Sequence, residues 1–188
     1  MVQQEAPRWN VWVGTVNVDY NGIVLFDPAA LAGHFGSIAP GTDLHSRFTS
    51  SEEGDVVLRR GIVVPILAID DAGYDVVVRL ASEPEVIRTE DVVCENGIFA
   101  LRVCSGNVIV ADLAAIMDWL DEPIGLSVPV DSGNYSVRIR GYRRVDWKQR
   151  ALEAAGYEFV LRPVRRLPRV TGDTAKSMRT LNWWDDKK

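Results

Sequence analysis

The feature that most constrains the fold is an order of short motifs that occurs twice along the chain. In each occurrence a glycine precedes an apolar run that ends in aspartate, and a second apolar run, a polar turn and a tyrosine-led run follow. Short apolar runs bounded by turn residues are typical of strands. The matching segments are 22–27 and 106–112, 63–69 and 124–130, and 74–79 and 135–140.

These matches make residues 20–103 and 104–164 two divergent copies of one unit. The sequence therefore predicts a single globular unit built from an internal duplication. Its expected parts are a first β repeat at 1–103, a second β repeat at 104–170 and a C-terminal tail at 171–188.

Strand and turn signals dominate the chain. Residues 9–20 are rich in β-branched and aromatic side chains, which favour a strand. Asn21 and Gly22 predict a two-residue hairpin to a partner strand at 23–26, because such turns need positive φ at both central positions. The full pattern predicts a mainly β fold, either an antiparallel β-sandwich or a barrel-like pair of sheets, with two or three short helices.

The helices are expected to be short. Asp27 and Asp112 are placed to cap helices at 28–35 and 113–120, because an aspartate side chain accepts hydrogen bonds from free N–H groups of a first turn. The stretch 148–155 predicts one or two further helical turns before a glycine.

The two copies differ most after the first helix. Asp27 is 47 residues from Tyr74, whereas Asp112 is 23 residues from Tyr135. The excess lies in residues 36–60, which are polar and rich in turn formers. We expect a long surface insertion here, and loops of that length are usually functional or mobile.

Charge is distributed unevenly along the chain. Residues 1–134 hold 7 Lys/Arg and 20 Asp/Glu, whereas residues 135–188 hold 14 and 6. Two explanations stand beside each other. Either the acidic and basic parts attract each other inside the fold or across a homodimer, or the acidic surface receives a cationic protein such as a nuclease.

Cysteine content and hydropathy indicate the compartment. Cys94 and Cys104 are the only cysteines, which excludes a disulfide framework and predicts two buried reduced thiols. No apolar run approaches the roughly 18–20 residues that span a bilayer. The start of the chain lacks the basic flank and apolar region of a signal peptide. We therefore expect a cytoplasmic protein with no membrane contact.

Catalytic and metal-binding motifs do not occur. His34 and His45 are the only histidines, and their surroundings have no metal-ligand spacing. There is no Gly-x-Ser-x-Gly elbow, and neither cysteine has a histidine close by in sequence. Asp70 and Asp71 have the spacing of a turn. We expect a protein that is not an enzyme and has no catalytic residues, metal or cofactor.

Arginines gather in the second copy. Arg138 and Arg140 fall on one face of a strand by alternation, so they could follow the phosphates of a nucleic acid. The acidic overall charge and the lack of a nucleic-acid motif argue against such binding. An exposed sheet face is the expected setting of these arginines.

The C-terminal tail is polar except for Leu181, Trp183 and Trp184. Adjacent tryptophans are costly to leave in water. They predict docking into a groove, either on the body of this chain or on a partner.

Three stretches also carry a resemblance to a known family. They are 96–98, 108–112 and 128–137, within residues 92–162. Their cadence of apolar strand, glycine turn and Gly-x-Tyr-x-Val turn resembles competence protein J-like nuclease inhibitors and other small bacterial β-rich proteins of undefined function. The resemblance implies an all-β fold and a role as a cytoplasmic inhibitor or immunity protein. It implies no functional residue.

Together these observations predict a non-enzymatic protein-binding module. We expect it to inhibit, or confer immunity to, a cationic nuclease or toxin, and a homodimer is compatible with the sequence. The alternative is a small-ligand-binding or enzymatic β-domain with a site between the repeats or under the insertion. The candidate partner-binding residues are Glu52, Glu53, Asp55, Asp70, Asp71, Asp75, Trp183 and Trp184.

Overall fold

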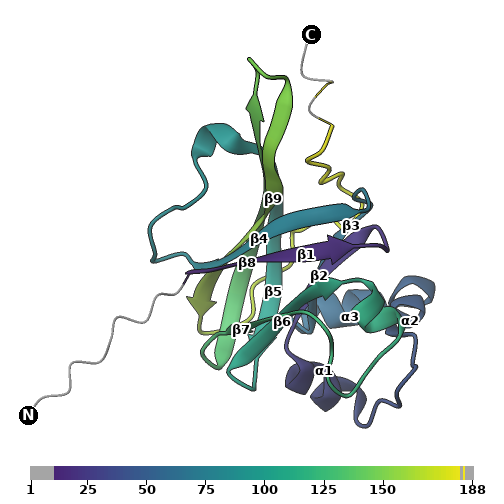
Figure 1. The fold of residues 1–188 in the computed structure, drawn as a ribbon. Helices are drawn as coiled ribbons and strands as arrows, with labels where there is room; N and C mark the ends of the chain where they lie inside the picture. Colours follow the sequence, from purple (N-terminus) through teal and green to yellow (C-terminus); the bar gives the residue numbers. More distant parts are fainter. Residues whose placement is uncertain (1–10, 183, 185–188) are drawn as a thin grey trace, which may run out of the picture.

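The computed structural model describes residues 11–182 and 184 of the 188-residue chain. In this part of the chain, strands form two sheets that face each other (Figure 1). The large sheet has the order β1 (Val11–Val18), β4 (Ala72–Leu80), β9 (Ala151–Val164), β8 (Gly133–Asp146) and β5 (Val92–Val103). The small sheet has the order β3 (Val63–Leu67), β2 (Gly22–Phe26), β6 (Asn107–Asp112) and β7 (Leu126–Pro129).

The sandwich architecture is confirmed, and the two sheets do not close into a barrel. All neighbouring strands are antiparallel except β4 and β9, which run parallel. The main core lies between the sheets and includes Leu25, Val76 and Phe159, all fully buried. A sandwich core of this kind is built from the inward-facing residues of both sheets.

Helices cover the other face of the small sheet (Figure 1). They are α1 (Pro28–Phe35), α2 (Leu44–Ser50), α3 (Glu53–Arg59) and α4 (Ala114–Met117). Because β2 is covered on both faces, its residues 23–26 are all apolar and fully buried. The predicted insertion at 36–60 holds α2 and α3 entirely, and the described part of the chain has four α-helices where two or three are expected.

Two aspartates, one in each predicted copy, make matching contacts. Asp27 Oδ1 accepts a hydrogen bond from Ala29 N at the start of α1, and Oδ2 accepts from Ser105 N in the turn before β6. Asp112 Oδ1 accepts from Ala114 N at the start of α4, and Oδ2 accepts from Asp19 N before β2. Each carboxylate therefore holds the turn that leads into the other copy's strand.

Two tyrosines also make matching contacts. The hydroxyls of Tyr74 and Tyr135 each donate to the backbone carbonyl four residues upstream, on Asp70 and Asp131, at 2.8 and 2.7 Å. The same turn chemistry thus precedes β4 and β8. A common origin of the two copies stays a prediction.

The predicted hairpin at Asn21 and Gly22 is wrong. Asn21 has the expected positive φ of 54°, but β1 pairs with β4 in the large sheet, whereas β2 pairs with β3 and β6 in the small sheet. The chain crosses between sheets at residues 19–21. This crossing lets the apolar side chains of Val16 and Val18 enter the core between the sheets.

Two predicted helices also differ from the structure. The stretch 148–155 mostly belongs to β9, which pairs with β8 from Ala151 onward in a long hairpin, because strand pairing overrides the local helical preference. The expected helix 113–120 is a single turn, α4.

The tail lies along the edge of the large sheet. Thr171 N and Gly172 N donate to the carbonyl of Ile98 in β5 at 2.8 and 3.0 Å. Further on, Met178 is buried, and its carbonyl accepts from the hydroxyl of Tyr157 at 2.8 Å. The chain thus covers its own β5 edge.

Candidate functional site

The acidic residues of the insertion differ in how closely other side chains of the protein pair with their carboxylates. Glu53 forms an ion pair with Arg47 at 3.0 Å and lies 3.7 Å from His34 Nε2. Glu52 is exposed at the start of α3 and forms no ion pair within the described residues. Asp55 is 76% exposed, and its contact with Arg59 is long, at 3.8 Å. Only Glu52 and Asp55 of this group present carboxylates that a partner could pair with readily.

The aspartates predicted alongside them lie elsewhere. Asp70 lies in the β3–β4 turn, at the far end of β3 from α3, and its Oδ1 is 3.7 Å from Arg179 Nε. Asp71 Oδ1 accepts from Asn21 N at 3.0 Å, so it holds the turn before β2. Asp75 is half-buried on β4 opposite Thr15. The structure does not bring these aspartates together with the insertion acids.

The tryptophans of the tail have separate outcomes. Trp184 is 59% exposed, and it takes part in an interaction within the structure. Trp183 lies outside the described residues. The sequence predicts that the tryptophans dock, whereas the buried residues in the described part of the tail are Met178 and Thr180.

A second acidic segment, which is not among the residues predicted from the sequence, follows α4. Asp118, Asp121 and Glu122 are exposed and form no ion pair in the described part of the chain. Backbone hydrogen bonds of 2.8 and 3.2 Å join Trp119 to Gly41 and Thr42, in the loop before α2. The segment therefore lies at the same end of the molecule as the insertion. The signal in the sequence is the acidic pair Asp121 and Glu122, directly after the predicted helix 113–120.

We call this region the acidic helical surface. It contains two exposed apolar side chains, Leu120 at 40% and Ile124 at 80% exposure. An apolar centre with a charged rim is the usual anatomy of a protein interface. The acidic helical surface consists of Glu52, Asp55, Asp118, Leu120, Asp121, Glu122 and Ile124.

The histidines form no metal site. His34 Nδ1 lies 3.2 Å from Arg60, and His45 lines a hollow of about 600 Å³ under the insertion with Phe48 and Leu58. Within residues 11–182 and 184, no group of three or more His, Cys, Asp or Glu side chains could hold a metal ion.

The cysteines only partly match expectation. Both thiols are free, and burial raises the pKa of the half-buried Cys94. Cys104 is exposed, so the prediction of two buried thiols is wrong for this residue. Cys104 lies in the turn that Asp27 holds, where only its backbone N–H is bound to the carboxylate.

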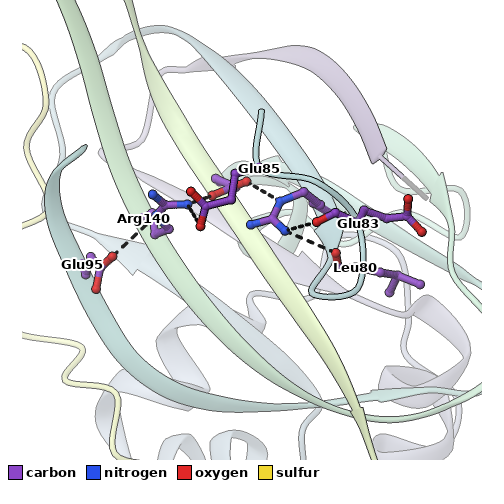
Figure 2. A network of polar contacts seen from close by, with 7 residues as sticks. Leu80, Glu83, Glu85, Glu95 and Arg140 are labelled. Carbon is purple, nitrogen blue, oxygen red and sulfur yellow. Dashed lines mark hydrogen bonds and ion pairs between the residues drawn. The ribbon is translucent and has the colours of Figure 1, made fainter. Parts of the chain in front are cut away.

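The predicted arginine face is only half correct. Arg138 is exposed on the outer face of the large sheet, but Arg140 is only 6% exposed. Arg140 Nη1 donates to Glu158 Oε2 at 2.8 Å, and Arg79 Nε donates to Glu158 Oε1 at 2.7 Å (Figure 2). Glu158 is fully buried, and it sits directly opposite Arg140 in the β8–β9 register. We call Arg79, Glu158 and Arg140 the buried triad.

The buried triad holds a covering segment on the sheet. Arg79 Nη1 also donates to the carbonyls of Leu80 and Glu83 at 3.4 and 2.8 Å, which fixes the start of segment 81–91 (Figure 2). At the other end of the segment, η1 (Thr89–Asp91) is held through Asp91.

The carboxylate of Asp91 accepts hydrogen bonds from two arginines, Arg88 and Arg144. Arg88 donates two hydrogen bonds of 2.9 and 2.8 Å to its carboxylate, and Arg144 adds two of 3.3 and 3.1 Å. The bonds from Arg88 first, and those from Arg144, hold the pKa of Asp91 below its usual range.

Basic side chains of residues 135–188 therefore pair with acidic side chains of residues 1–134 inside the fold. Arg144 pairs with Asp91, Arg179 with Asp70, and Arg140 with Glu85 and Glu95. The first explanation of the charge asymmetry holds for these pairs. It does not extend to the acidic helical surface, where most of the carboxylates have no such partner in the structure.

Comparisons with known proteins give a distant likeness only. No family model matches the chain, and no curated protein matches it. Among solved structures, the chain is similar to ComJ of Bacillus subtilis, an inhibitor of the DNA-degrading activity of NucA. The identity is 13% and the TM-score 0.45, over 83% of this chain and 96% of that one.

A second solved structure, crocagin biosynthetic gene J, is similar at 14% identity and a TM-score of 0.47, over 83% of this chain and 97% of that one. Among the described residues, no helix has the length and apolar character that crossing a bilayer requires. The distant resemblance to competence protein J-like inhibitors that the sequence predicts is confirmed as a resemblance.

Proposed function

We propose that this chain is a non-enzymatic protein-binding module that masks a basic protein, of the nuclease or toxin kind, with its acidic helical surface. The observation that carries the proposal is a set of exposed carboxylates, most of them without an arginine partner among the described residues, at the same end of the molecule as two exposed apolar side chains. Elsewhere the fold pairs many of its acidic groups internally. That one of the similar solved structures inhibits a nuclease is a property of that protein.

The two kinds of residue on this surface have different roles. Carboxylates such as Glu52 and Asp121 attract a cationic partner over distance and so raise the association rate. Ile124, at 80% exposure, supplies apolar area that is buried only in the complex and so slows dissociation. An inhibitor that acts by covering a partner needs both effects.

The experiment compares single variants with the same change in charge. Glu52→Lys and Asp121→Lys each place a cation on the acidic helical surface, and Glu153→Lys places one on β9, where the side chain is also exposed. Immobilised wild-type and variant proteins are used to capture basic proteins from the native host, and the captured protein is then purified for kinetics and for an assay of its activity.

We expect the partner's activity to fall in the presence of the wild type. Glu52→Lys and Asp121→Lys should lower the association rate about tenfold at low salt, with a smaller effect at high salt. Ile124→Ala should mainly raise the dissociation rate. Glu153→Lys should behave as the wild type. Capture that is equal for all variants, or a host sample that yields no basic partner, would contradict the proposal.

A further inference from the structure

The outer face of the large sheet holds a hollow that the acidic helical surface does not use. Its volume is about 690 Å³, within the range of roughly 300–1,000 Å³ that is usual for small-molecule sites. Its lining residues come from segment 81–91 and from strands β4, β5, β8 and β9. Four arginines line it: Arg79, Arg138, Arg140 and Arg162.

Two of these arginines pair with no side chain in the part of the chain that the structure describes. Arg138 lies opposite Val160 and Arg162 opposite Ser136 in the β8–β9 register. The two arginines are thus diagonal neighbours on one face, with Cα atoms about 7–8 Å apart. Both side chains are exposed, and neither makes an ion pair or a side-chain hydrogen bond within the described residues.

A third arginine is incompletely bound although it is buried. Arg140 is 6% exposed, and its Nε has no hydrogen-bond acceptor in the described structure. Besides Glu158, which accepts from Nη1 at 2.8 Å, two carboxylates face this guanidinium at 3.5 Å, that of Glu95 from Nε and that of Glu85 from Nη1 (Figure 2). A charge-assisted hydrogen bond is about 2.7–2.9 Å long. A buried guanidinium with an unused N–H is therefore left at the hollow.

Glu85 and Glu95 are more exposed than Glu158 and lie farther from the arginine that they pair with. Glu158 is fully buried and bonded to Arg79 and Arg140 at short distance, so it is part of the fold. The side chains of Glu85 and Glu95 are 58% and 49% exposed and come from two separate segments. They can turn away into solvent without uncovering an apolar core.

We propose that this hollow is a binding site for a small molecule that carries a phosphate or carboxylate group. The oxyanion contacts Arg138 and Arg162 and takes the open N–H of Arg140 as Glu85 and Glu95 turn aside. Guanidinium groups match the geometry of both oxyanions and remain charged at every accessible pH. Ser136 and Thr89 add hydroxyl groups to the lining, and Ile98 and Val160 add an apolar floor.

The test is calorimetric titration of the full chain with pyrophosphate and with citrate. The two probes separate a phosphate preference from a carboxylate preference. Arg138→Gln and Arg162→Gln remove the exposed donors and should each weaken binding of the preferred probe about tenfold or more. Arg169→Gln removes an exposed arginine that does not line the hollow and should leave binding unchanged.

A further variant examines the carboxylates. Glu95→Gln removes a negative charge that competes for Arg140, so the preferred probe should bind more tightly. Its control, Glu153→Gln, removes the same charge outside the hollow. No binding of either probe, or equal losses in Arg138→Gln and Arg169→Gln, would overturn the proposal. Because these variants lie outside the acidic helical surface, the result is independent of protein binding by that surface.

Discussion

Replacing Glu158 with glutamine should destabilise the fold strongly. The change removes the negative charge between two guanidinium groups that are 4% and 6% exposed, and it weakens hydrogen bonds of 2.7 and 2.8 Å to Arg79 and Arg140. Glutamine keeps one acceptor oxygen, so one of the two hydrogen bonds can persist with a neutral acceptor. Two buried cations then lose the carboxylate between them, and the only ion pairs left to them among the described residues are the longer ones of Arg140 with Glu85 and Glu95, at 3.5 Å.

The magnitude follows from these contacts. Each hydrogen bond to a charged group contributes about 1.5–3 kcal/mol, and removing one partner of a buried ion pair costs about 3–5 kcal/mol. We expect Glu158→Gln to lower the free energy of unfolding by about 3–5 kcal/mol. A loss of 1 kcal/mol lowers the thermal unfolding midpoint by about 2–4 °C for a chain of this size, so Glu158→Gln should lower that midpoint by roughly 6–20 °C.

Urea unfolding followed by circular dichroism measures this change. Glu153→Gln is the matched control, because Glu153 is exposed on the same strand, and its effect should stay within about 0.5 kcal/mol. Adding Arg140→Gln to Glu158→Gln should cost less than the sum of the two single changes, since it removes one of the uncompensated cations. A loss below about 1 kcal/mol for Glu158→Gln would refute the electrostatic reasoning.

Other predictions concern single groups. Ellman's reagent should modify the exposed Cys104 quickly, and it should modify Cys94 slowly because burial raises the pKa of that thiol. Cys104→Ser should remove the fast phase of the reaction. Equal rates for the two thiols would contradict the structure. Because its folded pKa is lowered, Asp91 stabilises the fold above its unfolded pKa near 3.8, and this contribution disappears as pH falls through the folded pKa. Asp91→Asn should therefore cost about 1–2 kcal/mol at pH 7 in urea unfolding and almost nothing in strong acid. Burial raises the pKa of Tyr74 to about 12, so the wild type should lose stability between pH 10 and 12, and Tyr74→Phe should flatten this loss; an unchanged alkaline slope would speak against it.

Local chemistry predicted the elements that depend on neighbours in sequence. Asp27 caps α1 because its carboxylate and the following Pro28 act within one turn. The strand at 23–26 is recognisable because it is apolar throughout and ends at that cap. The expected turn after each second apolar run is present because tyrosine and the carbonyl four residues upstream lie close in sequence.

Elements that depend on distant partners could not be predicted in this way. Whether the turn at Asn21 closes a hairpin depends on Asp112, which binds the backbone N–H of Asp19 from 93 residues away. The alanines at 151–155 are strand residues only because β8 pairs with them. The alternation of β8 correctly gave the face of Arg140, but its burial follows from Glu158 on β9 and from segment 81–91 above it.

The reciprocal contacts of Asp27 and Asp112 have a consequence for the order of folding during synthesis. The carboxylate of Asp112, which binds the turn at residues 19–20, is synthesised more than 90 residues after that turn. Likewise, the backbone N–H of Cys104, which binds the Asp27 carboxylate, is synthesised 77 residues after Asp27. Until then β2 also lacks β6, its central neighbour in the small sheet. β2, whose residues 23–26 are all apolar, is thus synthesised long before its partner β6, and it must avoid association with other chains during that interval.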